Sequence, residues 1–484
     1  MSTTGLGALL TGVGAPNDPV VHVGVDTSVT RSELEAAADA LAADLGRAGV
    51  LPGQAVAVSL PNGSDAIAAL FGVWRAGAVH VPLNPRLTPG EQQHVLDAVR
   101  PAAIVTDGMR VQTRAGAATY AEDVALISMT SGTTGRPKPV LLRHDGVTDL
   151  LDGVIGTLRS GRANEPARKP MPNLVPVSLS LWAGIYQVLF AFRVGAPVVI
   201  MPAFDTREFA RIVAAFGIRS SVLPPAAMVM LCDDESITDL APLRYVRSIS
   251  SPLSPLQARR FRDRFGIAVL NGWGQTEIGG EIVGWSAADS SAFGDAKLGS
   301  VGRPHRGVVV RAVDADGNDV PLDGSGELWV TTPALSAGYA DGADLSDRLS
   351  PDGWFRTGDV GRVDADGFVW VEGRVSDMIN RGGLKVFPAE VVEVLLLSPA
   401  IADAHVVGVP DVRLGEVPWA FVVASPGTPV PEPAVLEQLC REHLAPYKVP
   451  VGFVTVEALP RNEIGKVLGN QLVAMAPVEA PTDP

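Results

Sequence analysis

The sequence predicts an α/β protein in which a large N-terminal domain of two parallel-type α/β subdomains plus a small β-barrel precedes a C-terminal α+β domain. Three observations lead to this prediction. The length of 484 residues exceeds what a single hydrophobic core supports. Strand and helix patterns alternate in two series, the second over about residues 149–270, as in parallel sheets with crossover helices. From about Gly299, short apolar runs alternate with Asp-Gly turns, which indicates antiparallel strands or a small barrel.

The first series begins with a helix that has a clear start signal. Thr30 and Glu33 form a capping-box signature. Beyond this helix we expect a strand over residues 56–58, a helix over 64–75 and a strand over 78–82, which is the order of strand–helix–strand units in a parallel sheet. Apolar residues at helical spacing support the first helix: Leu34, Ala38, Leu41 and Leu45.

Asp-Gly pairs mark the change of pattern in the second half of the chain. They predict tight connections between short strands, and they stand at residues 316–317, 323–324, 352–353 and 366–367. After Arg374 a compact α+β domain is predicted. Its expected elements are a helix over 388–397, strands over 404–409 and 419–423, a helix over 432–443 and a strand over 452–456.

The composition limits both the function class and the compartment. The net charge of −14 disfavours a non-specific nucleic-acid binder, which normally carries a basic stripe. No apolar run approaches the ~18 residues of a membrane span, and the N-terminus lacks a signal-peptide pattern. Cys232 and Cys440 have no metal-ligand spacing and are expected to be unpaired thiols. We therefore expect a cytoplasmic protein with no membrane span and no nucleic-acid partner.

A loop rich in glycine and hydroxyl side chains follows the apolar strand predicted over residues 124–129. The loop ends at Lys138, one of only six lysines among 39 basic residues. Glycines let the backbone approach a ligand closely, and successive amides and hydroxyls can surround phosphate oxygens while a cation offsets their charge. The spacing does not fit the P-loop of nucleotide hydrolases. The residues expected to bind phosphate are Thr130, Ser131, Gly132, Thr133, Thr134 and Gly135.

The string from Thr130 to Lys138, TSGTTGRPK, resembles the signature of the adenylate-forming superfamily, which comprises acyl-CoA synthetases, adenylation domains and beetle luciferases. The pattern is most similar to that of acyl-CoA synthetases. It implies an ATP-dependent, AMP-forming ligase that activates a carboxylic acid as acyl-AMP and passes the acyl group to coenzyme A. Further strings of the superfamily follow in the expected order: Asn271–Glu277, Gly326–Leu328, Trp354–Asp359, Gly373–Arg374 and Pro460–Lys466.

The resemblance implies a nucleotide site around the string NGWGQTE. Trp273 would offer a flat face to a purine, and it stands where the superfamily usually has tyrosine. Thr276 would lie near the α-phosphate, and Glu277 would be a hard oxygen ligand for Mg²⁺. Asp359, in a predicted Thr-Gly-Asp turn, would hold the ribose diol with support from Arg374. The remaining nucleotide-binding residues implied are Ser251, Asn271, Gly272 and Gly274.

The last of the resembling strings supplies the implied catalytic cation, Lys466. Adenylation brings a carboxylate onto the α-phosphate, and a mobile ammonium offsets the repulsion between these two anions. A compact point charge of this kind differs from the planar fork of arginine, the residue that this chain otherwise prefers. The implied catalytic set is completed by Thr276, Glu277 and Lys138.

The resemblance also implies two poses of a mobile C-terminal domain. An N-terminal domain over residues 1–373 would be followed by a hinge over 374–376 and by the C-terminal domain over 377–484. The pivot would be Ser376, where Asp or Lys is usual in the superfamily. One pose would deliver Lys466 for adenylation, and rotation at the hinge would open a path for the thiol. The glycines implied to line that thiol tunnel are Gly382 and Gly383.

The acyl pocket is expected to involve the segment from Met171 to Met201. This segment has no Asp or Glu, which disfavours an amino-acid substrate because its α-ammonium would lack a partner. Many acyl-CoA synthetases carry histidine near Ser180, whereas this chain has none between His144 and His305. We expect a bulky apolar acid, such as a long-chain, polycyclic or aryl acid. The residues assigned to the pocket are Ser180, Trp182, Ser250, Gly272 and Gly274.

Three alternatives use the same residues or the same fold. A ligase that loads the phosphopantetheine of a carrier protein would share the thiol path, although fatty-acyl-AMP ligases usually carry an insertion that the stretch from Gly326 to Arg374 lacks. A light-emitting enzyme is disfavoured because no residue demands that activity. A non-catalytic binder of nucleotide or acyl groups is a different class of protein, and it is disfavoured by Lys466, Glu277 and Asp359.

Overall fold

The computed structural model describes residues 5–130, 138–159, 170–249, 253, 255–461 and 467–476. The chain forms two compact units. The first comprises residues 1–310, 330–355 and 366–369, and the second comprises 311–329, 356–365 and 370–484. The domain boundaries expected at residues 373 and 377 remain a prediction.

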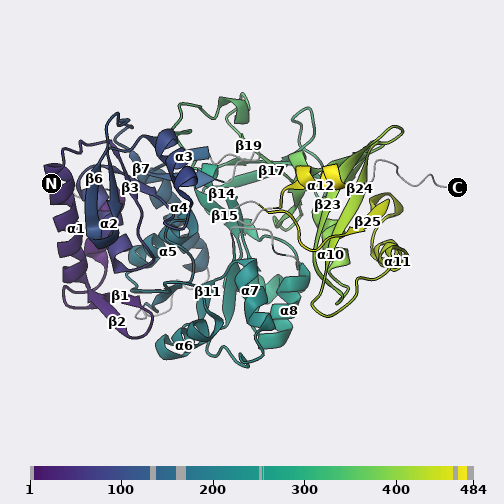
Figure 1. The fold of residues 1–484 in the computed structure, drawn as a ribbon, viewed down its shortest axis with the longest axis horizontal. Helices are drawn as coiled ribbons and strands as arrows, with labels where there is room; N and C mark the ends of the chain where they lie inside the picture. The colour runs from purple at the N-terminus through teal and green to yellow at the C-terminus, as the bar shows by residue number, and fades with distance from the viewer. Residues whose placement is uncertain are drawn as a thin grey trace. The chain divides into compact units, whose positions relative to one another are not determined.

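The first unit contains a six-stranded sheet in the order β6 (Arg110–Thr113), β5 (Ala103–Thr106), β3 (Ala55–Val58), β4 (Val79–Pro82), β7 (Val124–Thr130) and β8 (Lys138–Arg143). The inner strands are parallel, and the edge strands β6 and β8 are antiparallel to their neighbours. Helix α1 (Arg31–Arg47) starts with the predicted capping box and buries the four predicted apolar residues. It packs along α2 (Ser64–Arg75) (Figure 1). The other helical elements here are η1 (Gly5–Gly12), η2 (Asp107–Met109) and α3 (Pro89–Val99).

Two smaller sheets complete the α/β part of the first unit. One has the order β2 (Thr27–Thr30), β1 (Pro19–Val23), β10 (Val198–Ile200) and β9 (Asn173–Val175), and the other β11 (Ser220–Val222), β12 (Tyr245–Ser248) and β13 (Ala268–Asn271). All of their pairings are parallel except that of β1 with β2. The second helix–strand series is thus confirmed. Its helices are α4 (His144–Arg159), α5 (Trp182–Arg193), α6 (Thr206–Phe216), α7 (Pro225–Asp233) and α8 (Pro255–Phe265).

Short strands dominate the region from Trp273 to Arg374, as predicted. A three-stranded antiparallel sheet has the order β14 (Trp273–Gln275), β15 (Gly280–Gly284) and β16 (Arg303–Pro304). A four-stranded sheet follows in the order β17 (Val309–Val313), β18 (Gly326–Thr331), β19 (Phe355–Val363) and β20 (Val369–Arg374). Three of the predicted Asp-Gly turns have their glycine at positive φ: Gly317, Gly353 and Gly367. The helical elements between the strands are η3 (Thr276–Ile278), α9 (Ala287–Phe293), η4 (Ser346–Arg348) and η5 (Val375–Asp377).

The C-terminal part of the second unit is the predicted α+β arrangement. Its sheet has the order β22 (Leu384–Val386), β21 (Ile379–Arg381), β24 (Gly415–Ala424) and β23 (Ile401–Asp411), and β25 (Gly452–Thr455) pairs with β24. Strands β23 and β24 form a long antiparallel hairpin. Buried apolar side chains of the sheet pack with those of α10 (Pro388–Leu395) and α11 (Pro433–His443). The remaining helical elements are η6 (Pro446–Lys448) and α12 (Gly469–Met475).

Two expectations concern the chain as a whole. Cys232 and Cys440 are buried and are not joined in a disulfide, as predicted. Among the helices that the structure describes, none combines the length and the apolar character that a membrane crossing requires.

Candidate active site

The predicted phosphate loop connects the last two strands of the six-stranded sheet. Thr130 ends β7, Lys138 begins β8, and the two residues pair across the antiparallel ladder. The Thr130 hydroxyl donates a hydrogen bond of 3.4 Å to the Lys138 carbonyl. The loop therefore closes between paired strands that hold both of its ends. The predicted phosphate-binding residues within it lie outside the described residues: Ser131, Gly132, Thr133, Thr134 and Gly135.

Glu277 lies beside the base of this loop, within a network that the sequence did not reveal. Its side chain is nearly buried on η3, and its Oε1 accepts a hydrogen bond of 3.4 Å from the Tyr339 hydroxyl. The Nη1 of Arg348 lies 3.3 Å from the same oxygen. The Tyr339 ring lies under the Lys138 ammonium, 5.3 Å from the ring centroid, within range of a cation–π contact. Tyr339 thus connects the predicted Mg²⁺ ligand to the predicted phosphate-loop lysine.

The charges around Tyr339 affect its ionisation. Burial raises the pKa of its hydroxyl, and the Glu277 carboxylate raises it further, while Arg348 acts in the opposite direction. Tyr339 therefore remains a neutral donor to Glu277. Neither Tyr339 nor Arg348 could be selected from the sequence, because both lie more than 60 residues from Glu277.

The glycines of the string NGWGQTE are explained by close backbone packing. A Cβ on Gly274 would lie 1.6 Å from the Gly280 carbonyl oxygen, so β14 and β15 approach as closely as they do because residue 274 has no side chain. A Cβ on Gly272 would lie 2.8 Å from Oε1 of Glu281. Trp273 is only 9% exposed, so most of its indole surface is packed against protein. Asn271, at the end of β13, is partly exposed.

Asp359 and Arg374 are brought together within the second unit. Nε of Arg374 lies 3.0 Å from Oδ1 of Asp359, which is itself buried. The sequence indicated a turn at this point, but β19 continues through it, with Gly358 at φ +72°. Asp359 therefore lies within a strand and not in a turn.

Trp182, Gly272 and Gly274 converge near the start of β15. Trp182 begins α5, and its Nε1 donates a hydrogen bond of 2.7 Å to the Gly279 carbonyl. A Cβ on Gly280 would lie 2.9 Å from the same nitrogen. Gly274 and Gly272 in turn pack against Gly280 and Glu281. Two further predicted residues of this region, Ser250 and Ser251, lie outside the described residues.

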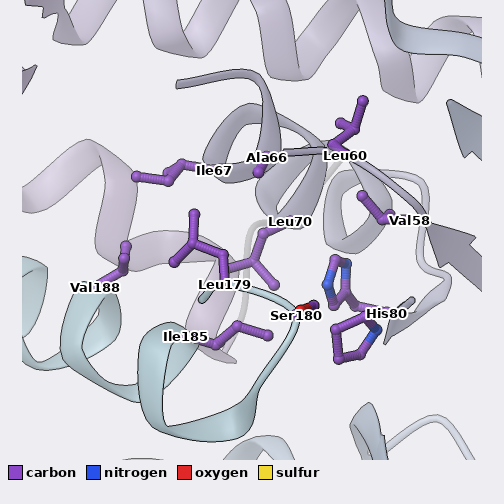
Figure 2. A pocket seen from close by; sticks show the side chains of 11 residues that line it. Val58, Leu60, Ala66, Ile67, Leu70, His80, Leu179, Ser180, Ile185 and Val188 are labelled. Atoms are coloured by element: carbon purple, nitrogen blue, oxygen red, sulfur yellow. The ribbon is translucent and has the colours of Figure 1, made fainter. Parts of the chain in front are cut away.

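Ser180 lines a small cavity of about 20 Å³, enough for one or two water molecules. Its hydroxyl lies 2.6 Å from that of Ser178. Figure 2 shows the His80 imidazole beside Ser180, while apolar side chains form the rest of the wall. A histidine therefore does lie near Ser180, although it comes from β4, in a distant part of the sequence. The lining is completed by Val58, Leu60, Ala66, Ile67, Leu70, Pro82, Leu179, Ile185 and Val188.

The predicted hinge and thiol tunnel lie in local structures that are well defined. Ser376 lies on η5, and its hydroxyl donates a hydrogen bond of 2.8 Å to Asp377. Gly382 and Gly383 connect β21 to β22 and have φ of +61° and +90°, as a two-residue hairpin turn requires. Their glycine identity is thus explained by the turn, whether or not a thiol passes beside them. Lys466 lies outside the described residues.

Two family models match the chain. The model described as "AMP-binding enzyme" matches residues 12–120 and 112–340, and that described as "AMP-binding enzyme C-terminal domain" matches residues 390–466. Together they cover more than half of the 484 residues.

The chain belongs to the adenylate-forming, AMP-binding enzyme family. Curated relatives agree with this assignment. A fatty acid–[acyl-carrier-protein] ligase, ScoC of Streptomyces coeruleorubidus, is 30% identical, with 92% of this chain and 91% of that protein covered. A feruloyl-CoA synthase of Amycolatopsis is 31% identical, with 92% and 94% covered. The chain is thus an enzyme of the acid–thiol ligase type.

Solved structures of AMP-binding enzymes share its fold. The o-succinylbenzoate-CoA synthetase MenE of Bacillus subtilis, in complex with an acyl-adenylate, has a TM-score of 0.83 at 26% identity and covers 96% of each chain. ATP-bound MatB of Rhodopseudomonas palustris has a TM-score of 0.85 at 24% identity, with 97% and 98% covered. The predicted fold class is confirmed.

His80 is expected to make this AMP-binding enzyme sensitive to acid. Burial lowers its pKa to about 3, against 6.5 for an exposed histidine. Below pH 6.5 the unfolded chain gains a proton that the folded protein does not bind until near pH 3. The free energy of unfolding therefore falls as the pH decreases through this window, by up to ~1.4 kcal/mol per pH unit. Urea unfolding of the wild type and of His80→Leu at pH 7 and pH 5 measures the effect.

The expected outcome is that His80→Leu loses less stability than the wild type between these two pH values. The matched control is His94→Leu, because His94 is exposed on α3, and this change should leave the pH dependence of the wild type intact. If His80→Leu and the wild type lost equal stability, the neutral state assigned to the buried imidazole would be contradicted.

Proposed function

We propose that this enzyme activates a carboxylic acid with ATP, releasing pyrophosphate, and transfers the acyl group from acyl-AMP to coenzyme A. The observation that carries the proposal is the grouping of Glu277, Tyr339 and Lys138 at the base of the predicted phosphate loop. A carboxylate and an ammonium thus lie close to where the loop begins and ends, and we propose that they act with the hydroxyl and amide groups of the loop on phosphate oxygens. Membership of the AMP-binding family supports ATP as the nucleotide.

The residues around Glu277 fit a magnesium ion shared with the nucleotide. Mg²⁺ is usually held by one or two carboxylates together with substrate phosphates and water. In the described part of the chain no group of three or more His, Cys, Asp or Glu side chains could hold a metal ion by itself. Glu277 would thus supply one oxygen, and Mg²⁺ would neutralise phosphate charge. Thr276 precedes it on η3 and is proposed to contact the α-phosphate.

For the nucleoside, we propose the residues that the sequence assigned to it. Asp359 and Arg374 would hold the ribose diol, with the carboxylate accepting both hydroxyl hydrogens. Trp273 would contact the purine through the part of its ring that is not packed against protein. The adenine site would be completed by the loop that contains Ser251 and by the residues beside Trp273, which are Asn271, Gly272 and Gly274.

In the chemical step, Lys466 and Lys138 would offset the repulsion between the acid's carboxylate and the α-phosphate. No covalent bond between enzyme and substrate is required, because positioning of the two reactants supplies much of the rate. Rotation at residues 374–376, with Ser376 as pivot, would then open the thiol path beside Gly382 and Gly383. The thiol attacks the mixed anhydride, the thioester forms and AMP leaves.

The acid is proposed to have a bulky apolar body. The segment from Met171 to Met201 contributes apolar side chains, and Trp182 and Tyr186 stand one helical turn apart on it, with ring centroids 5.8 Å apart. A flat or extended apolar acid suits such a wall. The relative named feruloyl-CoA synthase supports an aryl acid in particular. The free thiols Cys232 and Cys440 support a reducing, cytoplasmic location.

Release of pyrophosphate with a panel of acids tests this function. We expect release that depends on ATP, Mg²⁺ and a subset of the acids. In a second arm, purified coenzyme A and a phosphopantetheinylated carrier protein compete as acceptors. Thioester on the carrier protein alone would establish the alternative that the relative ScoC suggests. No pyrophosphate and no AMP with any acid would leave only the non-catalytic alternative.

Loss of the carboxylate charge at Glu277 gives a direct test of its role. Glu277→Gln is expected to lower kcat/KM for Mg²⁺-ATP by on the order of 100-fold, because a neutral amide is a poorer ligand and stabiliser of developing charge. Raising the Mg²⁺ concentration should recover part of this loss. Steady-state pyrophosphate release at several Mg²⁺ concentrations measures both. Glu208→Gln, at an ion pair exposed on α6, is the control that should behave as wild type, and a loss insensitive to Mg²⁺ would argue against metal ligation.

A further inference from the structure

A buried charged cluster lies behind the glycines assigned to the acyl pocket. Arg247 on β12 forms an ion pair with Glu281 on β15. The Nε2 of His305 lies 3.7 Å from Oε1 of the same carboxylate, which is too far for a hydrogen bond. All three residues are at most 9% exposed. Burial of charges has a large desolvation cost, so a cluster of this kind calls for an explanation beyond stability.

The carboxylate of this cluster remains ionised. Burial acts to raise the pKa of Glu281, but the charge of Arg247 and the contact with His305 outweigh this effect and lower the pKa to about 2. The guanidinium of Arg247 also donates a hydrogen bond of 3.3 Å to the Trp285 carbonyl. Arg247 and Glu281 are therefore held in place, and their opposite charges leave the pair with no net charge.

Two buried polar atoms in this region have no hydrogen-bond partner in the described part of the protein: the Tyr186 hydroxyl and Nε2 of His305. Both residues are more than 90% buried. The Tyr186 ring lies 5.8 Å from the ring of Trp182, whose Nε1 donates to the carbonyl of Gly279, two residues before Glu281. Burial raises the pKa of the Tyr186 hydroxyl, and the charge of Glu281 acts in the same direction. The other ring nitrogen of His305 lies 3.1 Å from the Thr157 hydroxyl, which anchors the imidazole.

An unpaired buried polar atom destabilises the folded state, and most native proteins avoid it. The Tyr186 hydroxyl and Nε2 of His305 are two such atoms. Each of these two atoms would gain its missing hydrogen bond from a ligand group that reached the cluster.

The acyl pocket is the direction from which a ligand would come. Gly272 touches the cluster directly, since a Cβ on it would lie 2.8 Å from Oε1 of Glu281. Gly284 on β15 also touches the cluster, since a Cβ on it would lie 2.8 Å from Nη2 of Arg247. A strand glycine often marks a close approach of a ligand or of another backbone. Tyr186 follows Trp182, another residue assigned to the pocket, by one turn of α5.

We propose that Tyr186 and His305 form a polar end of the acyl pocket, which binds a neutral hydroxyl or carbonyl group at the end of the acid that does not react. The inference rests on the proposed function. It adds a polar group at the non-reacting end of the bulky apolar acid proposed above. Arg247 and Glu281 hold the two binding side chains in a fixed electrostatic environment.

The charge balance decides the kind of group. A second carboxylate would stand near the ionised Glu281, and an ammonium would stand near Arg247, so each would meet like charge at low dielectric. A neutral group meets neither penalty. A hydroxyl can donate and accept, and a carbonyl can accept from the Tyr186 hydroxyl.

The primary experiment uses the wild-type enzyme and sets of acids that share one skeleton. Each set contains an aryl or alkyl acid with a distal methyl group, its hydroxyl and keto analogues, and its distal carboxylate analogue. We expect kcat/KM for pyrophosphate release to favour the hydroxyl or keto member by on the order of 10- to 100-fold in at least one skeleton. A methyl or carboxylate member that is equal or better in every skeleton would overturn the inference. If no acid reacts, the proposed function fails as well; turnover without preference overturns only the polar end.

A conservative variant localises the preference. Tyr186→Phe removes the unpaired hydroxyl, so it should fold with unchanged or higher thermal stability and should reduce the hydroxyl-to-methyl preference several-fold. Its KM for ATP should not change. The matched control is Tyr120→Phe, because the Tyr120 hydroxyl donates to the Val99 carbonyl, away from this cluster, and this variant should keep the full preference. Retention of the full preference by Tyr186→Phe would also overturn the inference.

Discussion

Replacing Lys466 with alanine is expected to lower the rate of acyl-adenylate formation by on the order of 100-fold or more. The reason is electrostatic: two anions must approach for the carboxylate to attack the α-phosphate, and the lysine ammonium would be the mobile charge between them. The rate of thioester formation from supplied acyl-AMP should change little, because that half-reaction has no such approach. Pyrophosphate release measures the first half-reaction, and thioester yield from synthetic acyl-AMP measures the second.

Two further variants sharpen the test. Lys466→Arg keeps the positive charge but replaces a compact ammonium with a planar fork, and it should recover only part of the adenylation rate. Lys448→Ala removes another lysine of the C-terminal region, whose ammonium pairs with Glu390 at 2.5 Å, and adenylation should persist in it. Equal losses in both half-reactions for Lys466→Ala would argue against separate adenylating and thiol-transferring poses.

Local signals in the sequence predicted much of the fold. The capping box at Thr30 and Glu33 is present, and the C-terminal helices and strands fall within a few residues of their expected positions. These features depend on residues that are close together in the chain, where caps, turns and periodicity act. The Thr-Gly-Asp turn is the exception, because pairing of β19 within its sheet prevails over the local preference.

The electrostatic environment of the site could not be predicted in the same way. Ser180 appeared to lack a histidine, yet His80 stands beside it across the cavity. The segment from Met171 to Met201 has no acidic residue, yet Trp182 within it donates to the carbonyl of Gly279, two residues before the buried Glu281. Such contacts join elements about 100 residues apart, and one sequence gives no periodicity or spacing that links them. The charged side chains of β12 and β15 therefore could not be predicted from the segment between Met171 and Met201.

The ion pair between Arg247 and Glu281 gives the largest stability effect that we expect. Glu281→Leu should lower the free energy of unfolding by ~3–5 kcal/mol, because it leaves a buried guanidinium without its counter-charge. Arg247→Met should have a similar cost, since the carboxylate would then be the unpaired buried charge. The double variant should be close to wild type, because well-packed apolar side chains often replace a buried ion pair without loss. Urea-unfolding midpoints of the four proteins at pH 7 measure this cycle.

The pH dependence of the same pair gives an independent check. The pKa of Glu281 is lowered from 4.5 to about 2, so the carboxylate contributes stability that is complete above pH 4.5 and is lost as the pH falls towards 2. The size of this contribution is on the order of 3 kcal/mol. The wild type should therefore lose more stability than the double variant below pH 4.5, a window lower than the one expected for His80. Additive losses in the double variant, or equal acid sensitivity of both proteins, would show that the two side chains act independently, and the fixed electrostatic environment proposed for Tyr186 and His305 would then have no basis.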